Sequence, residues 1–159
     1  MLKKALSLLL ATVMMFSFSG CVNQIIGGAF FLFLVATGDD RADKDEIFEL
    51  VCEKEGELLE AIENGDFSTF ENQGFIKDIS ANESVVEFSC GGAGVGSGTA
   101  YVGFFYSSAD DMAAVWCAPP SADDLTPSGD GFEWQAANGD NRYYTEHICG
   151  NFYYYEASF

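Results

Sequence analysis

Residues 131–157, GFEWQAANGDNRYYTEHICGNFYYYEA, contain the clearest strand and turn pattern of the chain. Asn138-Gly139 and Gly150-Asn151 divide this stretch into three runs that are rich in aromatic residues. Both dipeptides suit tight turns, because Gly and Asn accept positive φ. The expected strands are Gly131–Ala136, Arg142–Cys149 and Asn151–Ala157. The stretch therefore predicts a three-stranded antiparallel meander.

Three further strands are expected upstream of this meander, at Phe75–Ile79, Ser84–Cys90 and Thr99–Ser107. Between them and the meander, residues 108–130 contain all three prolines of the chain. Proline interrupts regular structure, so we expect a long loop there, with one short helix around Asp111–Val115.

One amphipathic helix is predicted ahead of the strands, from the sequence DKDEIFELVCEKEGELLEAIENGD at residues 43–66. Asp43 and Glu46 have capping-box spacing, Asn64-Gly65 is a typical stop signal, and a bend is expected near Glu55 and Gly56. The apolar face consists of Ile47, Val51, Leu58 and Ile62. A helix followed by hairpins predicts an α+β domain over residues 39–159, in which the helix packs on an antiparallel sheet of five to six strands.

The N-terminus, MLKKALSLLLATVMMFSFSGC, has the pattern of a secretory signal peptide. Lys3 and Lys4 precede an apolar run, and small residues precede Cys21. We expect residues 1–20 to be the signal peptide. Its last residues with the cysteine, Phe18-Ser19-Gly20-Cys21, resemble the lipobox of bacterial lipoproteins, with Phe where Leu is usual.

The lipobox resemblance implies that Cys21 receives a diacylglyceryl group and becomes the first residue of the mature chain. Each buried CH₂ of such palmitate-type chains stabilises membrane binding by about 0.8 kcal/mol. The expected location is the extracytoplasmic face of the cell membrane. The C-terminal stretch GFEW…NGDNRYYTEHICGNFYYYE is similar to small uncharacterised lipoproteins of anaerobic Gram-positive bacteria, a resemblance that implies no particular activity.

A second apolar run, IIGGAFFLFLVA at residues 25–36, follows this cysteine closely. A transmembrane helix needs about 20 residues, so this run is too short to span alone. Three interpretations stay open for the segment 21–38: an apolar tether or membrane-proximal segment, part of one span over residues 16–37, or a buried first element of the domain.

Charge excludes one class of partner. The 159 residues include 7 Lys and Arg against 25 Asp and Glu, for a net charge of −18. A nucleic-acid-binding face needs clustered basic residues, so no nucleic acid is expected as a partner. Removal of the signal peptide takes away Lys3 and Lys4 and leaves a chain of 139 residues with a net charge of −20.

Four cysteines remain besides Cys21, and they are Cys52, Cys90, Cys117 and Cys149. In an exported protein they permit two disulfides in three connectivities, and buried free thiols are the alternative. Cys90 and Cys149 both end predicted strands and form the first pair to consider. No two have CxxC spacing, which argues against a zinc or thioredoxin-like site.

Other motifs that could bind a ligand or take part in catalysis have ordinary structural explanations. The glycine-rich residues 91–98 lack phosphate-loop spacing and suit a hairpin loop. His147 shares a predicted strand face with Cys149, without a marked oxyanion hole. Asp123, Asp124 and Asp130, or Asn138 with Asp140, have calcium-ligand chemistry without the EF-hand pattern. We therefore predict no catalytic residue, metal site or cofactor.

Aromatic residues are the most distinctive feature of the C-terminal half. Adjacent aromatics on a strand point to opposite faces, so one face can pack under the helix while the other is exposed or covered by the long loop. An exposed face beside carboxylates suits a sugar, a peptide or a protein partner. The candidate binding surface is Tyr106, Trp134, Tyr144 and Tyr154. Cross-strand pairing that only stabilises the sheet is the alternative.

These observations favour a non-catalytic binding module over an enzyme. The sequence leaves two alternatives open. The first is a hydrolase of cell-envelope or other polymers, acting through a pair of carboxylates. The second is a structural or inhibitory envelope protein with a flat polar surface.

Overall fold

The computed structural model describes residues 40–71, 73–94 and 98–159. The predicted signal peptide (residues 1–20), Cys21 and the apolar run 25–36 lie outside the described residues. Residues 39–159 form one compact unit. Among the described residues, no helix combines the length and the apolar character that a membrane span requires.

Helix α3, Lys44–Asn64, begins and ends where the sequence predicts. The Asp43 carboxylate accepts a hydrogen bond from the Asp45 amide (2.9 Å), and Gly65 ends the helix in the left-handed conformation at φ +65°. The backbone departs from helical geometry at Lys54, which confirms the expected bend beside Glu55. The helix buries Ile47, Val51, Leu58 and Ala61.

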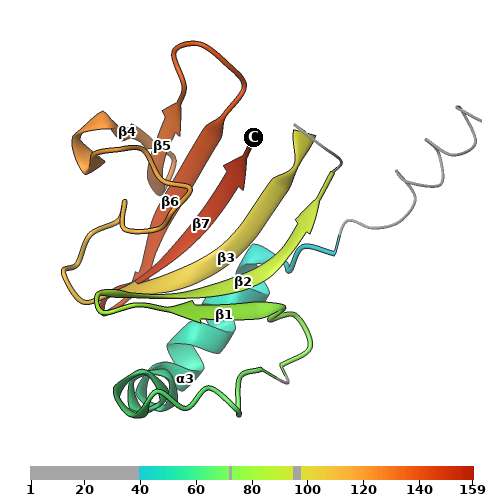
Figure 1. The fold of residues 1–159 in the computed structure, drawn as a ribbon, viewed down its shortest axis with the longest axis vertical. Helices are drawn as coiled ribbons and strands as arrows, with labels where there is room; N and C mark the ends of the chain where they lie inside the picture. The colour runs from blue at the N-terminus through green and yellow to red at the C-terminus, as the bar shows by residue number, and fades with distance from the viewer. Residues whose placement is uncertain (1–39, 72, 95–97) are drawn as a thin grey trace, which may run out of the picture. The chain divides into compact units, whose positions relative to one another are not determined.

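Within the described part of the chain, seven antiparallel strands form one sheet, and α3 packs on one of its faces (Figure 1). They are β1 (Asp78–Ala81), β2 (Val85–Ala93), β3 (Ala100–Ser107), β4 (Thr126–Ser128), β5 (Gly131–Gln135), β6 (Arg142–Cys149) and β7 (Phe152–Ser158). Their order is β1-β2-β3-β7-β6-β5-β4, so the C-terminal strand lies between β3 and β6. The predicted α+β fold and the β5-β6-β7 meander are confirmed.

Three local predictions differ from the structure. The short strand β4 was not expected, and it pairs with β5 to bring the sheet to seven strands. The first strand occupies residues 78–81 instead of 75–79. Residues 111–115 form turns instead of a helix, and a short 3-10 helix lies later, at Ala122–Asp124. Its Ser121 side chain accepts a hydrogen bond from the Asp123 amide, which favours this position for the turn.

Each face of the sheet has its own apolar core. On the helix side, Phe88 and Phe104 stack with ring centroids 4.4 Å apart. On the other side, Val115, Cys117 and Leu125 from the loop of residues 108–125 cover aromatic residues of the sheet. We call these the helix-side core and the loop-side core. Together they bury most of the aromatic residues of the predicted C-terminal strands.

A β-bulge interrupts β6 near its end. His147 pairs with Tyr153, whereas Cys149 pairs with Phe152, so the register shifts by one residue between them. The bulge reverses the alternation of side chains. His147 therefore packs edge-on against Tyr153 of the loop-side core, while Cys149 packs against the helix-side core. The expectation that these two residues share a face is wrong for this reason.

Candidate binding groove

Two adjoining hollows lie along the sheet, and together we call them the groove. The larger is lined by residues of both sheet faces, among them Tyr144 of the helix side and Trp134 of the loop side. The larger has a volume of about 720 Å³ and the smaller about 300 Å³, and both are lined by Arg41 and Glu156. The larger extends over β5, β6 and β7, and the smaller lies at the start of α3. A hollow of this size is in the range of small-molecule sites.

Strand register places the polar groups of the groove in two parallel rows. Glu133 of β5 pairs with Tyr144 of β6, which pairs with Glu156 of β7. The next row consists of Gln135, Arg142 and Ser158. All six residues line the larger hollow. Directly opposed residues have Cβ atoms about 4.5–5.5 Å apart, so each row presents a continuous set of side chains.

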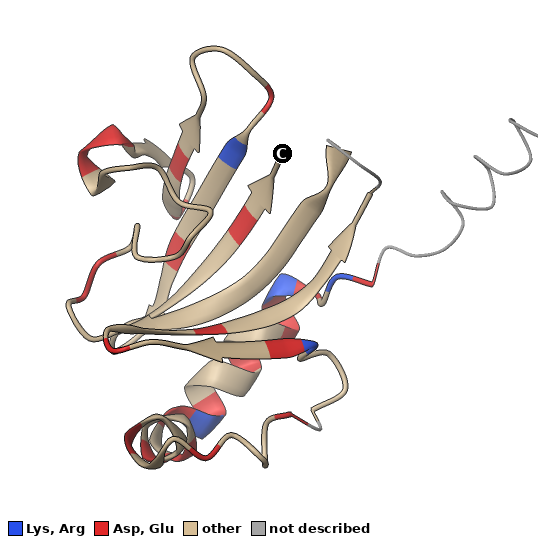
Figure 2. Ribbon diagram, viewed as in Figure 1, with Lys and Arg blue, Asp and Glu red and all other residues tan. Residues whose placement is uncertain are grey.

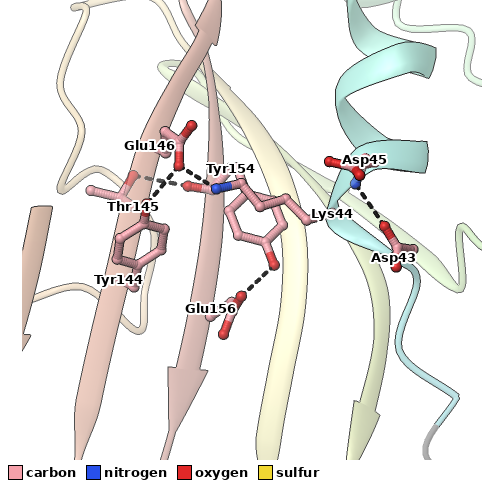
Figure 3. A network of polar contacts seen from close by, with 8 residues as sticks. All are labelled: Asp43, Lys44, Asp45, Tyr144, Thr145, Glu146, Tyr154 and Glu156. Atoms are coloured by element: carbon pink, nitrogen blue, oxygen red, sulfur yellow. Dashed lines mark hydrogen bonds and ion pairs between the residues drawn. The ribbon is translucent and has the colours of Figure 1, made fainter. Parts of the chain in front are cut away.

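A network of polar contacts holds Tyr144 in place where the groove meets α3 (Figure 3). The Tyr144 hydroxyl donates to Glu146 Oε2 (2.5 Å), and the same carboxylate forms an ion pair with Lys44 at the start of the helix. Beside them, the Tyr154 hydroxyl donates to Glu156 Oε1 (2.6 Å). The Lys44 ammonium also lies 5.5 Å from the Tyr144 ring centroid and 5.6 Å from that of Tyr154.

Charge interactions fix the protonation of this network. Burial tends to raise the pKa of Glu146, but the hydrogen bonds from Lys44 and Tyr144 outweigh it and hold the pKa below the usual glutamate value. Burial, together with the bond to Glu146, raises the pKa of the Tyr144 phenol well above its usual range. Tyr144 therefore stays a neutral donor and Glu146 a charged acceptor at neutral pH.

The four residues of the candidate binding surface occupy different environments. Tyr144 is half-buried in the groove, and Tyr154, 2% exposed, belongs to the helix-side core beside it. Tyr106 is half-buried on the same face but packs on Phe152, outside the groove. Trp134 lies between Glu133 and Gln135 in β5 and packs against the loop-side core, although it also lines the groove. The structure thus groups Tyr144 with Tyr154 and separates the other two.

Tyrosine hydroxyls attach the long loop to the opposite face of the sheet. Tyr143 donates to the Met112 carbonyl (2.8 Å), and Tyr153 donates to Asp110 Oδ1 (2.5 Å). Burial raises the pKa of both phenols above the usual range. Tyr143 and Tyr153 are accordingly structural, because the loop covers them and accepts their hydrogen bonds.

Trp116 is an exposed aromatic residue that the sequence analysis did not select. Its side chain is 66% exposed, yet its ring stacks on Phe159 (5.5 Å) and its indole N–H donates to Glu87 Oε1 (3.2 Å). Tyr101 contacts it edge-on at 5.9 Å. A tryptophan within a proline-rich loop was the available signal, since such a segment runs over the surface.

The cysteines of the described residues are free thiols. Cys90 lies on β2 and Cys149 on β6, with β3 and β7 between them. Three strand spacings amount to about 14 Å, which is too far for a disulfide. The first pair considered from the sequence is therefore wrong, because sheet order separates two strand ends that the sequence could not place. Burial raises the pKa values of Cys90 and Cys117 to about 12.

The remaining candidate residues have plain structural surroundings. The exposed His147 ring contacts the Gly150 carbonyl oxygen at 2.8 Å, within its own turn. The first three residues of the glycine-rich stretch, Gly91, Gly92 and Ala93, belong to β2, so this strand extends beyond its expected end at Cys90. Across the described ranges, no three His, Cys, Asp or Glu side chains gather as metal ligands, and this includes Asp123, Asp124, Asp130 and Asp140.

Comparison with known proteins identifies no relative: no family model, curated protein sequence or solved structure matches this chain. The groove itself is therefore the basis for a functional interpretation.

Proposed function

We propose that this chain is a lipid-anchored extracytoplasmic binding module, attached to the membrane through Cys21, that binds an oligosaccharide in the groove. The observation that supports the ligand proposal is the pair of cross-strand rows, which place residues with carboxylate, amide, guanidinium and hydroxyl groups beside Tyr144 along one hollow. A sugar ring combines an apolar face with many hydroxyls, and tyrosine presents an apolar body with a polar edge.

The charge distribution supports an uncharged ligand. Acidic residues are spread over the domain and basic ones are few (Figure 2). The groove nevertheless contains both signs, with Arg41 and Arg142 among the lining residues beside Glu133 and Glu156. Mixed charges offer hydrogen bonds in both directions, while an anionic polymer would meet repulsion from the rest of the surface.

Tryptophan fluorescence provides the test, because the chain has two tryptophans and only Trp134 lines the groove. In the detergent-solubilised full-length Trp116→Phe variant, Trp134 is the sole tryptophan. We expect saturable changes in its emission with at least one tetrasaccharide among those of N-acetylglucosamine, glucose and mannose. Adding Tyr144→Ala should abolish the change.

Tyr106→Ala is the matched control, because Tyr106 is also a half-buried tyrosine on the helix side but does not line the groove. It should leave the fluorescence response intact. No saturable response to any of the three sugars, or an equal loss in both variants, would refute the ligand proposal. Saturation by an unrelated peptide instead would favour a peptide-binding module.

The same incubations distinguish a hydrolase from a binding module. Glu133 and Glu156 are two strands apart, so their Cα atoms are about 10 Å apart, close to the carboxylate separation of inverting glycosidases. Mass spectrometry of the sugars should show intact tetrasaccharide after prolonged incubation. Shortened products that disappear in Glu133→Gln would establish the enzyme instead.

The anchor is tested separately by intact mass spectrometry of the membrane fraction. We expect an acylated chain that begins at Cys21, and its loss in Cys21→Ala. A full-length unmodified chain in the membrane would refute the anchor while leaving the groove proposal in place.

A further inference from the structure

Helix α3 and strand β6 run beside each other between two fixed points. At one end, Lys44 of the helix forms its ion pair with Glu146 of the strand. From Lys44 to Cys52 the helix advances about 12 Å, and from Glu146 to Cys149 the strand advances about 10 Å. Cys52 therefore lies at about the same distance from the Lys44–Glu146 ion pair as Cys149 does, and the two cysteines are neighbours across the helix–strand contact.

A second contact lies just beyond the two cysteines. Gly150, in the turn after β6, has φ +51°, and a Cβ atom there would lie 2.5 Å from Glu55 Oε1 of the helix. Glu55 is one turn after Cys52, and Gly150 directly follows Cys149. The turn and the helix thus approach closely on the far side of the cysteine pair.

The β-bulge completes the arrangement, because it turns Cys149 toward the helix. The Cys52 thiol is near enough to Cys149 to contribute to the raised pKa of the Cys149 thiol. Cys52 is exposed and Cys149 is half-buried, so an oxidant can reach the pair from the helix surface. Cys90 and Cys117 are buried, one in each core.

We propose that Cys52 and Cys149 are a disulfide-forming pair that ties α3 to β6 when the protein meets a disulfide oxidant. The Cys52 thiolate attacks a sulfur of the oxidant, forms a mixed disulfide and releases one thiolate. The Cys149 thiolate then attacks the Cys52 sulfur and expels the second. The protein loses two protons and two electrons, and the oxidant is reduced to two thiols.

Exposure decides the order of these steps. Burial, with the neighbouring Cys52 and Glu55, raises the pKa of Cys149 to about 12, so its thiolate is scarce before the mixed disulfide forms. The exposed Cys52 is therefore the first to react.

Tryptic peptide mapping tests the pair directly, since the basic residues separate the cysteines. Cleavage after Lys44, Lys54, Lys77 and Arg142 puts Cys52 in residues 45–54 and Cys149 in residues 143–159, while Cys90 and Cys117 stay together in residues 78–142. After the full-length protein is incubated with excess oxidised glutathione, we expect peptide 45–54 linked to 143–159. Free thiols at both positions, or 143–159 linked to 78–142, would overturn the proposal.

Thermal unfolding gives a second readout. The bond would close a loop of nearly one hundred residues, so the oxidised protein should unfold about 10 °C above the reduced one. Cys52→Ser should remove this difference at little cost to the reduced protein, because Cys52 is exposed. Cys117→Ala is the control and should retain the difference. Equal unfolding temperatures in oxidised and reduced wild type would count against the bond.

Discussion

Replacing Glu146 with glutamine tests whether the network beside the groove stabilises the fold. The Glu146 side chain is 12% exposed and accepts hydrogen bonds from Lys44 and Tyr144. Glutamine keeps the shape but removes the charge, so the tyrosine bond becomes a neutral one and loses about half its strength. Lys44 is 37% exposed, so solvent screening limits the ion pair to about 1 kcal/mol. The expected loss is about 2 kcal/mol of unfolding free energy, measured by urea denaturation at neutral pH.

The pH dependence of this loss checks its cause. The pKa of Glu146 in the folded protein lies below the ordinary value of 4.5, so its charge stabilises the fold above that pH. The contribution disappears as the pH falls through the folded-state pKa. The difference between wild type and Glu146→Gln should therefore be largest near neutral pH and shrink as the pH falls below 4.5. A difference that stays constant, or is absent at neutral pH, would refute the reasoning.

Glu57→Gln provides the matched control for this experiment. Glu57 also pairs with a lysine, Lys54, at 3.0 Å, but its side chain is 58% exposed. Water already solvates such a pair, and one turn of helix brings its partners together without tertiary packing. Its replacement should change the urea midpoint by no more than the experimental error. A loss equal to that of Glu146→Gln would show that general charge effects, rather than the network, dominate.

Two further substitutions probe the rest of the fold. Phe104→Ala should cost about 3–5 kcal/mol in urea denaturation, because Phe104 is fully buried against Phe88, and a loss below about 1 kcal/mol would contradict the described core. Gly150→Ala should lower the thermal midpoint, since φ is +51° and the new Cβ would meet Glu55. Adding Glu55→Ala should recover part of that loss. If the midpoint does not recover, the strained backbone of the turn, and not the contact with Glu55, causes the loss.

Local sequence signals predicted most of the elements, because their causes are local. The Asp43 cap and the Gly65 stop set the ends of α3, and the Gly150 turn joins β6 to β7. Strand β4 was missed because it has three residues, one of them proline, and forms only against β5. Sheet order was also beyond reach, since the contact between β3 and β7 joins residues about fifty positions apart.

The candidate site was harder to predict than the fold. Sequence reasoning selected four aromatic residues as one surface, but the structure groups only Tyr144 with Tyr154 at the groove on the helix side. Tyr106 lies outside the groove, and Trp134 packs against the loop-side core. The sequence could not distinguish Glu133 and Glu156 from the other acidic residues among its 25, because only strand register shows that they flank Tyr144. A β-bulge likewise has no clear sequence signal, so the side of the sheet that Cys149 faces emerged only from the structure.

The two outermost strands have a consequence for solubility. A free sheet edge presents unpaired N–H and C=O groups that can recruit a strand from another molecule. Here β1 has four residues, mostly exposed and beginning at Asp78, and β4 has three, with Pro127 at its centre. Neither edge offers another chain a long row of backbone partners, and the aromatic strands β3, β7 and β6 lie inside the sheet. Crowded copies of this domain are thereby protected from joining edge to edge into aggregates.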